Sequence, residues 1–290
     1  MALLAAAPAL ACSVCGCGDP LLTSSDPAAI NGTLRLQLDY EHLRIDAGTD
    51  GAPGFTDQLT QDSYRLNAVY RPVQDLSLTL TLPMVQKKIV TVGPAPSVTN
   101  SDLSGLGDVE VGVRYAAWRS VEVGARRVQE LAIGLGTSIP TGAHDAKMPD
   151  GSLVDPHGQL GTGGWGPFAG LYYRYEQGDW TGYANLGYRL RTEASYFDGS
   201  RYKFGDATLW SAHGQYRAGS RVVLDLGVDG RYAVADKATD PDGTVTSAVE
   251  NTGGTLLSAV PAIYFEAFKG AGSSPGARFP STRASSASRT

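Results

Sequence analysis

The stretch 76–82 reads Leu-Ser-Leu-Thr-Leu-Thr-Leu, with a leucine at every even position and a hydroxyl at every odd one. Successive side chains of a β-strand point to opposite faces of the sheet, so this stretch predicts a strand with one apolar and one polar face. The same alternation recurs along most of the chain, and no helical period competes with it. The pattern therefore predicts an all-β protein, either a sandwich or a closed barrel.

The spacing of the alternating stretches favours a barrel. We expect strands at about 33–45, 62–71, 76–85, 109–115, 130–139, 169–176, 180–191, 209–217, 222–232 and 255–268. Short connections alternate along much of the chain with long ones rich in Gly, Asp and Pro, at 46–59, 93–107, 141–166, 193–205 and 233–254. Outer-membrane barrels join their strands in this way, so residues 32–268 are expected to form an antiparallel up-and-down transmembrane β-barrel of about 10–12 strands.

The composition agrees with this class and excludes others. The 290 residues include 36 glycines and 14 tyrosines, which suit tight turns and half-buried sheet surfaces. The net charge of -5 provides no basic surface, so nucleic acid is not an expected partner. No run reaches the roughly 18 apolar residues of a membrane-spanning helix, but a spanning strand needs only about ten residues of alternating polarity.

The two ends of the chain differ from the rest. Residues 1–11 are uncharged, rich in Ala and Leu, and end in a small-x-small site, so we interpret them as a signal-peptide remnant without its charged start; a disordered Ala-rich terminus is the alternative. Residues 12–31 form a separate cysteine-containing segment. Residues 269–290 are rich in Ser, Arg and Gly and have no acidic residue, which predicts a disordered or non-native tail.

Alternation alone does not say whether the apolar face packs inside a sandwich or contacts lipid. Lipid is favoured by the export signal, which supplies a route to the membrane, and by aromatic residues near strand ends, where interfacial girdles lie. These aromatic residues are Tyr40, Tyr64, Tyr70, Tyr115, Trp180, Tyr188, Trp210, Tyr216 and Tyr232.

The polar face also suits a transmembrane barrel, because it carries charged groups appropriate to a watery interior. The residues expected to line this lumen are Arg65, Glu110, Arg114, Arg174, Glu176, Arg189, Arg191, His213, Arg217, Asp225, Asp229 and Arg231.

Three short motifs resemble those of a known family. The segment 105–109 reads Gly-Leu-Gly-Asp-Val, and two expected strands end in 80–83, Leu-Thr-Leu-Pro, and 138–142, Ser-Ile-Pro-Thr-Gly. These segments resemble motifs of the outer-membrane barrels grouped as MetA-pathway-of-phenol-degradation-like transporters, over roughly 34–268. The resemblance implies an outer-membrane channel or passive transporter, and no particular solute. Without the resemblance, the two glycines simply permit a tight entry into a strand, and proline ends strands because it cannot donate to the ladder.

Three cysteines, Cys12, Cys15 and Cys17, follow the cleavage site in a Cys-x-x-Cys-x-Cys pattern, and the chain has no others. Thiolates favour soft metals such as copper(I) or zinc, but a structural zinc site needs a fourth ligand. A disulfide among these exported cysteines, or lipidation of Cys12, explains the pattern equally well. A soft metal at this segment is the one cofactor that the sequence suggests.

No catalytic residues are assigned. Ser211 and His213 lie two apart on one face and could touch, but the sequence indicates no third group to orient them. One long loop contains His144, Asp145, Asp150, Asp155 and His157, which could gather a metal ion, but a solvated surface is the expected role.

The expected protein is therefore a monomeric, porin-like channel of the bacterial outer membrane that carries small solutes passively through a charged lumen. One alternative is a scaffold or conduit barrel around a periplasmic electron-transfer or metal-handling partner, with the cysteine segment as the contact. A further alternative is a secreted β-sandwich that binds a ligand.

Overall fold

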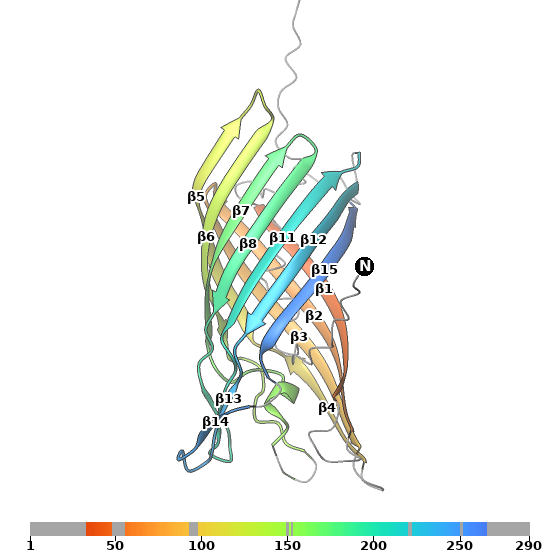
Figure 1. The fold of residues 1–290 in the computed structure, drawn as a ribbon, viewed down its shortest axis with the longest axis vertical. Helices are drawn as coiled ribbons and strands as arrows, with labels where there is room; N and C mark the ends of the chain where they lie inside the picture. The colour runs from red at the N-terminus through yellow and green to blue at the C-terminus, as the bar shows by residue number, and fades with distance from the viewer. Residues whose placement is uncertain are drawn as a thin grey trace, which may run out of the picture.

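The main element of the fold is one large antiparallel sheet that curls into a barrel (Figure 1). The computed structural model describes residues 33–47, 56–92, 98–148, 151, 153–219, 222–249 and 252–265. The sheet has 11 strands, of which ten follow one another in the order β1 (Thr33–Ala47), β2 (Thr56–Val73), β3 (Leu76–Val92), β5 (Val109–Glu122), β6 (Arg127–Ile139), β7 (Gly166–Gln177), β8 (Trp180–Arg189), β11 (Ala207–Arg217), β12 (Val222–Ala233) and β15 (Gly254–Phe265). The remaining strand, β4 (Val98–Leu106), pairs with the far end of β3. The first and last strands of this order, β1 and β15, both come to the right-hand side of the view in Figure 1.

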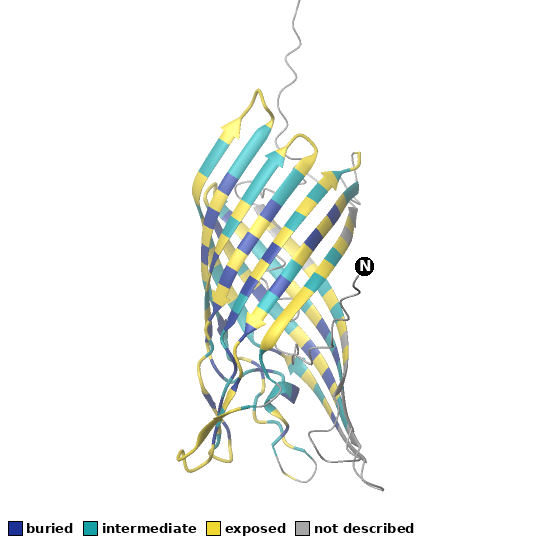
Figure 2. Cartoon of the chain, viewed as in Figure 1, coloured by how far each residue is buried: buried dark blue, intermediate teal, exposed yellow. Residues whose placement is uncertain are grey.

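The apolar face of the sheet lies outside, as Figure 2 shows by its alternating exposed and buried bands. Leu38 and Leu226 are 71% and 67% exposed, whereas the inward Ser77 and Thr81 of β3 are only 5% exposed. An outward apolar surface is what the hydrocarbon layer requires, and the ladders between neighbouring strands satisfy backbone groups that water cannot reach there. The fold is thus a transmembrane β-barrel, and the β-sandwich alternative is wrong because leucines and valines cover the outside of a single sheet instead of packing between two.

Aromatic side chains mark the limits of the lipid-facing band. All nine aromatic residues predicted to lie near strand ends are exposed on the outside. On β8, Trp180 lies at the turn end and Tyr188 near the loop end. Eight residues at about 3.3 Å each, on a strand tilted by about 40°, give a band of about 20 Å, close to the apolar band of known barrels.

The connections separate into two ends of the barrel. The β2–β3, β5–β6, β7–β8 and β11–β12 connections are short and share one end, which is uppermost in Figure 1. Long connections occupy the other end, where β9 (Ala194–Ser195), β10 (Arg201–Lys203), β13 (Lys237–Thr239) and β14 (Thr246–Ala248) form a separate four-stranded sheet. That sheet has its own buried cluster of Ala194, Tyr196, Tyr202 and Phe204.

Several elements extend beyond the predicted strands. The ten predicted strands are all present, but β2 begins at Thr56, within the predicted loop 46–59, and β3 continues beyond its predicted end at residue 85 to Val92. The strand β4 and the small four-stranded sheet were not predicted, nor was the single turn of 3-10 helix η2 (Pro156–Gly158). Among the described residues, no helix is long and apolar enough to cross a membrane. The predicted signal remnant, cysteine segment and tail lie outside the described residues.

Candidate functional site: the barrel interior and its mouth

Most of the residues predicted to line the lumen lie on the inward side of the sheet. Their side chains are buried or half-buried at positions that alternate with exposed apolar residues, on β2 (Arg65), β5 (Glu110, Arg114), β7 (Arg174, Glu176), β8 (Arg189), β11 (His213, Arg217) and β12 (Asp225, Asp229, Arg231). Arg191 differs, because β8 ends at Arg189 and the Arg191 backbone N–H donates to Asp206 Oδ1 at 2.8 Å. The predicted strand 180–191 is two residues too long.

Near the turn end, the interior contains a buried carboxylate between two guanidinium groups. The Glu130 side chain is 9% exposed, and it accepts hydrogen bonds from Arg119. The guanidinium of Arg71 lies 3.9 Å from the same carboxylate oxygen and also donates to the carbonyl of Gln74. Neither Arg71, Arg119 nor Glu130 was predicted as a lumen residue. Arg71 and Glu130 follow the inward parity of their predicted strands, whereas Arg119 faces inward only because a bulge between Ala116 and Trp118 changes the parity of β5.

An ion pair crosses the interior close to the loop ends of two strands. Arg189 on β8 pairs with Glu110 on β5, two strands that are separated by β6 and β7 in the sheet. The guanidinium of Arg189 also stacks over the Phe168 ring at 5.0 Å, and that of Arg114 stacks over Tyr172 at 5.1 Å. Both rings pack against a buried cluster of Ala207, Leu209 and Ala233, so side chains fill much of this level of the interior.

His213 is held between two carboxylates on the interior wall. Its Nδ1 lies 2.9 Å from Asp225 Oδ1, its Nε2 lies 2.9 Å from Asp229 Oδ1, and its ring stacks on Tyr183 at 4.7 Å. Because carboxylates only accept hydrogen bonds, both contacts exist together only for the imidazolium. The Ser211 hydroxyl instead accepts from Asn185 at 3.0 Å, so the Ser211–His213 pair considered from the sequence is not formed.

The three motifs of the family resemblance meet at the mouth of the barrel. Asp108 Oδ1 accepts from the Gly142 N–H at 3.0 Å, and Oδ2 accepts from the Thr162 N–H and hydroxyl at 2.8 and 2.6 Å. The Thr141 hydroxyl donates to the Gly107 carbonyl at 2.8 Å, and the Gly107 N–H donates to the Pro83 carbonyl at 2.8 Å. Asp108 thus closes the base of the long loop between β6 and β7, a role that a tight strand entry alone does not suggest.

Glycine is required where the two ends of this loop pass each other. A Cβ atom added to Gly142 would lie 2.6 Å from the Gly161 Cα, a contact with backbone that cannot move aside. The loop therefore leaves and rejoins the barrel wall at one point, as in a compact Ω-loop.

We expect Asp108→Asn to loosen this loop, because an amide in place of the carboxylate presents N–H groups to the N–H groups of Gly142 and Thr162. Trypsin cleavage after the exposed Lys147, within the loop, should become at least several-fold faster than in the parent protein. The matched control is Asp102→Asn, on the outward face of β4, which should leave the cleavage rate unchanged. Equal rates for Asp108→Asn and the parent would show that the carboxylate does not hold the loop.

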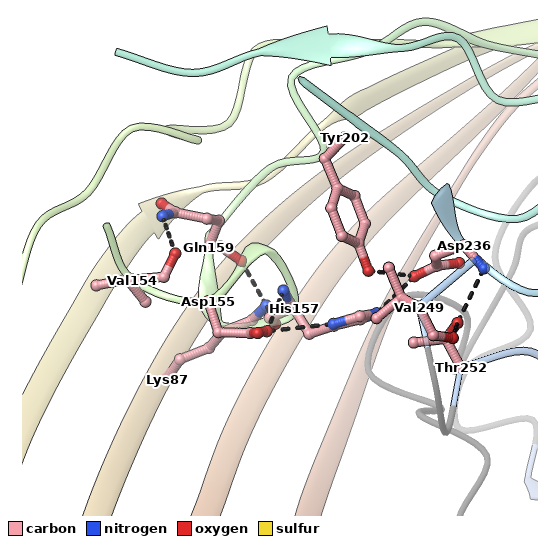
Figure 3. A network of polar contacts seen from close by, with 9 residues as sticks. All are labelled: Lys87, Val154, Asp155, His157, Gln159, Tyr202, Asp236, Val249 and Thr252. Atoms are coloured by element: carbon pink, nitrogen blue, oxygen red, sulfur yellow. Dashed lines mark hydrogen bonds and ion pairs between the residues drawn. The ribbon is translucent and has the colours of Figure 1, made fainter. Parts of the chain in front are cut away.

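The segment 153–162 of this loop, called the strap below, crosses between two sides of the mouth (Figure 3). Lys87 on β3 is 6% exposed, and its Nζ donates to the backbone carbonyls of His157 and Gln159. On the opposite side, His157 Nε2 lies 2.8 Å from Asp236 Oδ2, in the connection after β12. The strap therefore ties β3 to a connection six places along the strand order of the main sheet.

The strap is internally stiff. The Gln159 side chain is 1% exposed; its Oε1 accepts from the Ala146 N–H at 2.9 Å, and its Nε2 donates to the Val154 carbonyl at 2.8 Å. Asp155 caps η2 by accepting from the His157 N–H at 2.8 Å. These contacts hold the strap in one shape, so its tip is expected to move as a unit.

The carboxylates around His157 remain ionised well into the acidic range. Burial would raise the pKa of Asp236, but hydrogen bonds from His157, Tyr202 and the Gly205 N–H outweigh burial and hold that pKa below its ordinary value. The pKa of Asp155 is lowered as well: desolvation of this largely exposed carboxylate opposes the shift, and the His157 side chain and backbone and the charge of Lys87 outweigh it.

Sequence reasoning missed Lys87, Asp108, Gln159 and Asp236. Lys87 continues the inward parity of β3 beyond its predicted end at residue 85, and Asp108 belongs to a motif already noted. The sequence could therefore have indicated both residues. The contact between His157 and Asp236 joins residues 79 positions apart, and no local pattern could reveal it. The described residues contain no group of three or more His, Cys, Asp or Glu that could hold a metal, and Cys12, Cys15 and Cys17 lie outside them.

Comparison with known proteins agrees with the fold and with the motifs at the mouth. The chain is similar to the COG4313 outer membrane channel from Pseudomonas putida F1, with 16% identity, a TM-score of 0.54, and coverage of 83% of this chain and 98% of that one. No curated protein matches the chain. The family model described as MetA-pathway of phenol degradation matches residues 42–253. This range includes all three motifs, part of β1 and all of the next eight strands that surround the interior. The chain belongs to this family.

Proposed function

We propose that the protein is an outer-membrane channel that passes small solutes passively through its charged interior. The observation that carries this proposal is the inside-out arrangement of the sheet, with leucines and valines outside and charged side chains at every level of the interior. Such an interior lowers the cost of bringing a charged or polar solute through the membrane. Similarity to a solved outer membrane channel supports the fold that this function needs.

The interior is cationic, which suggests the kind of solute. The inward positive side chains are those of Arg65, Arg71, Lys87, Arg114, Arg119, Arg174, Arg189, Arg217 and Arg231, joined by the imidazolium of His213. The inward acids are fewer, namely Asp39, Glu41, Glu110, Glu130, Glu176, Asp225 and Asp229. We therefore infer a preference for small anions, although the whole chain has a net charge of -5.

Reversal potentials of single channels in a potassium chloride gradient test this preference. We expect chloride to be more permeant than potassium by roughly twofold or more, because the field of the interior concentrates anions. Replacing Arg217 with Gln should reduce the ratio, whereas replacing the outward Arg44 with Gln should not. A preference for potassium would contradict the inference, and an absence of current steps would contradict the channel itself.

Conduction needs a test of its own, because a narrow barrel whose interior is filled with side chains does not pass solutes. Purified protein whose folding is verified by heat-modifiable gel migration should give discrete current steps in planar bilayers and should swell liposomes in small sugars or amino acids. The conduit alternative depends on the cysteine segment and on a periplasmic partner, and it remains a prediction.

A further inference from the structure

The loop between β6 and β7 has a fixed base and a tip held by few contacts. Asp108 fixes the base through Gly142 and Thr162. At the tip, Lys87 holds backbone carbonyls, and the side-chain contact between His157 and Asp236 connects the strap to the far side of the mouth (Figure 3). Leu153 of the strap also packs against the buried cluster of the small sheet, so loss of the contact with Asp236 would leave the tip held on that side by apolar packing alone, while the base stays attached.

The contact depends on the protonation of His157. Its Nε2 faces Asp236 Oδ2 at 2.8 Å, and its Nδ1 faces Asp155 Oδ1 at 3.2 Å. Both carboxylates only accept hydrogen bonds, so His157 satisfies both contacts only with a proton on each ring nitrogen. A neutral ring carries one N–H, and its other nitrogen would then face a carboxylate oxygen, lone pair against lone pair.

The other groups around His157 are compatible with a proton on each nitrogen of its ring. Lys87 from β3 carries a positive charge and binds the carbonyl of His157. Tyr202 from β10 presents its ring edge-on at 5.8 Å and donates its hydroxyl to Asp236 at 2.7 Å, and Phe204 presents its ring at 5.4 Å. The pKa values of Asp155 and Asp236 lie below the ordinary value, so neither carboxylate titrates near neutrality. Among these groups, histidine is the one whose ordinary pKa lies between about pH 5 and pH 8.

We propose that His157 is a pH-sensitive latch, whose imidazolium holds the strap across the mouth and whose deprotonation releases the tip and opens the barrel. The direction of the pH dependence follows from the geometry. The latch is complete while the ring is protonated and is lost as the pH rises through the titration of the ring. The barrel is thus more closed in mild acid and more open at neutral to alkaline pH. The effect on current rests on the proposed channel function, whereas release of the strap does not.

Single-channel recording tests the effect on current. From about pH 5.5 to about pH 8 we expect the open-state occupancy to rise by about tenfold. His157→Gln should show no pH dependence, because its amide does not titrate. The matched control is His144→Gln in the same loop, where the ring contacts Tyr196 and Asp145 instead of Asp236 and the parent response should persist. A pH response that survives in His157→Gln would overturn the proposal.

Chemical labelling tests the latch without any current. Lys87 is buried beneath the strap, whereas its neighbour Lys88 is exposed outside the barrel, so the ratio of their labelling by an amine-reactive reagent reports the strap and cancels the common effect of pH on amines. In the parent protein, this ratio should rise several-fold between about pH 5.5 and about pH 8, and in His157→Gln it should not change with pH. Asp236→Asn, whose amide can donate to a neutral ring, should weaken or invert the rise.

The two measurements separate the possible failures. A labelling ratio that rises with pH while no current flows at any pH supports the latch and refutes the channel. Currents that flow while the labelling ratio stays constant refute the latch and support the channel. Heat-modifiable gel migration of each variant confirms that the barrel has folded before either measurement is interpreted.

Discussion

Leu80→Arg is expected to prevent efficient recovery of the folded barrel, because it places a charge on the lipid-facing side of β3. Leu80 lies in the alternating stretch 76–82 and is exposed on the outside. An arginine that faces lipid near the bilayer midplane costs a transmembrane barrel about 2–4 kcal/mol of folding free energy. Urea titration of the protein in lipid vesicles, with the folded form followed by gel migration, should show this loss.

Thr79→Arg provides the matched control. Thr79 precedes Leu80 and points inward, opposite Gly112 of β5. There the new guanidinium meets a polar interior that already holds arginines and acids. Folding should then be reduced much less than in Leu80→Arg. Equal losses at both positions would mean that the two faces of β3 do not differ in their surroundings, and the transmembrane assignment would fall.

Glu130→Ala should destabilise the barrel by about 3–5 kcal/mol, since removing one partner of a buried ion pair leaves uncompensated charge. The Glu130 carboxylate is close to the guanidinium groups of Arg119 and Arg71, and the side chains of all three are at most 16% exposed. Without the carboxylate, two positive groups would face each other inside the barrel. The midpoint of urea unfolding should therefore fall clearly below that of the parent.

Glu122→Ala is the control for this experiment. Glu122 pairs with Arg127 near the β5–β6 turn, where the two side chains are 45% and 34% exposed. An exposed ion pair contributes about 0–1 kcal/mol, so the unfolding midpoint should hardly move. If Glu130→Ala has no larger effect than Glu122→Ala, water screens the interior charges, and the contacts of Glu130 with Arg71 and Arg119 do not stabilise the barrel.

The membrane-spanning part of the fold could be predicted from the sequence because lipid imposes a strict pattern. Where one face of a strand contacts lipid and the other faces the interior, polarity alternates, and all ten strands with this property were predicted. The pattern disappears where strands leave the hydrocarbon layer, because the outward face then also carries polar residues such as Gln86 and Lys88. The first residues of β2, the last residues of β3 and the whole of β4 belong to that region, and they lie outside the predicted strands.

The candidate site was predictable only in part for a related reason. Inward charges such as Arg114 and Asp225 follow from strand parity, but their partners do not. Glu110 and Arg189 meet across the interior, and His157 and Asp236 meet at the mouth, each over 79 positions of sequence. Such contacts depend on how the sheet curls and how the loops return over its end, which no local pattern determines.

The junction between β4 and β5 sets which side of each strand faces outward. The two strands lie one after the other along the same side of β3, separated by Gly107 and Asp108. Leu106 of β4 is exposed at an even position, whereas Val111 and Val113 of β5 are exposed at odd positions, so the junction changes the phase of the alternation. Deleting one of its two residues would restore a single phase and rotate β5 by half a turn, which would bring Glu110 and Arg114 among the acyl chains. The two residues of the junction thus shift the phase of the alternation, which keeps apolar side chains on one side of this interrupted wall and charged side chains on the other.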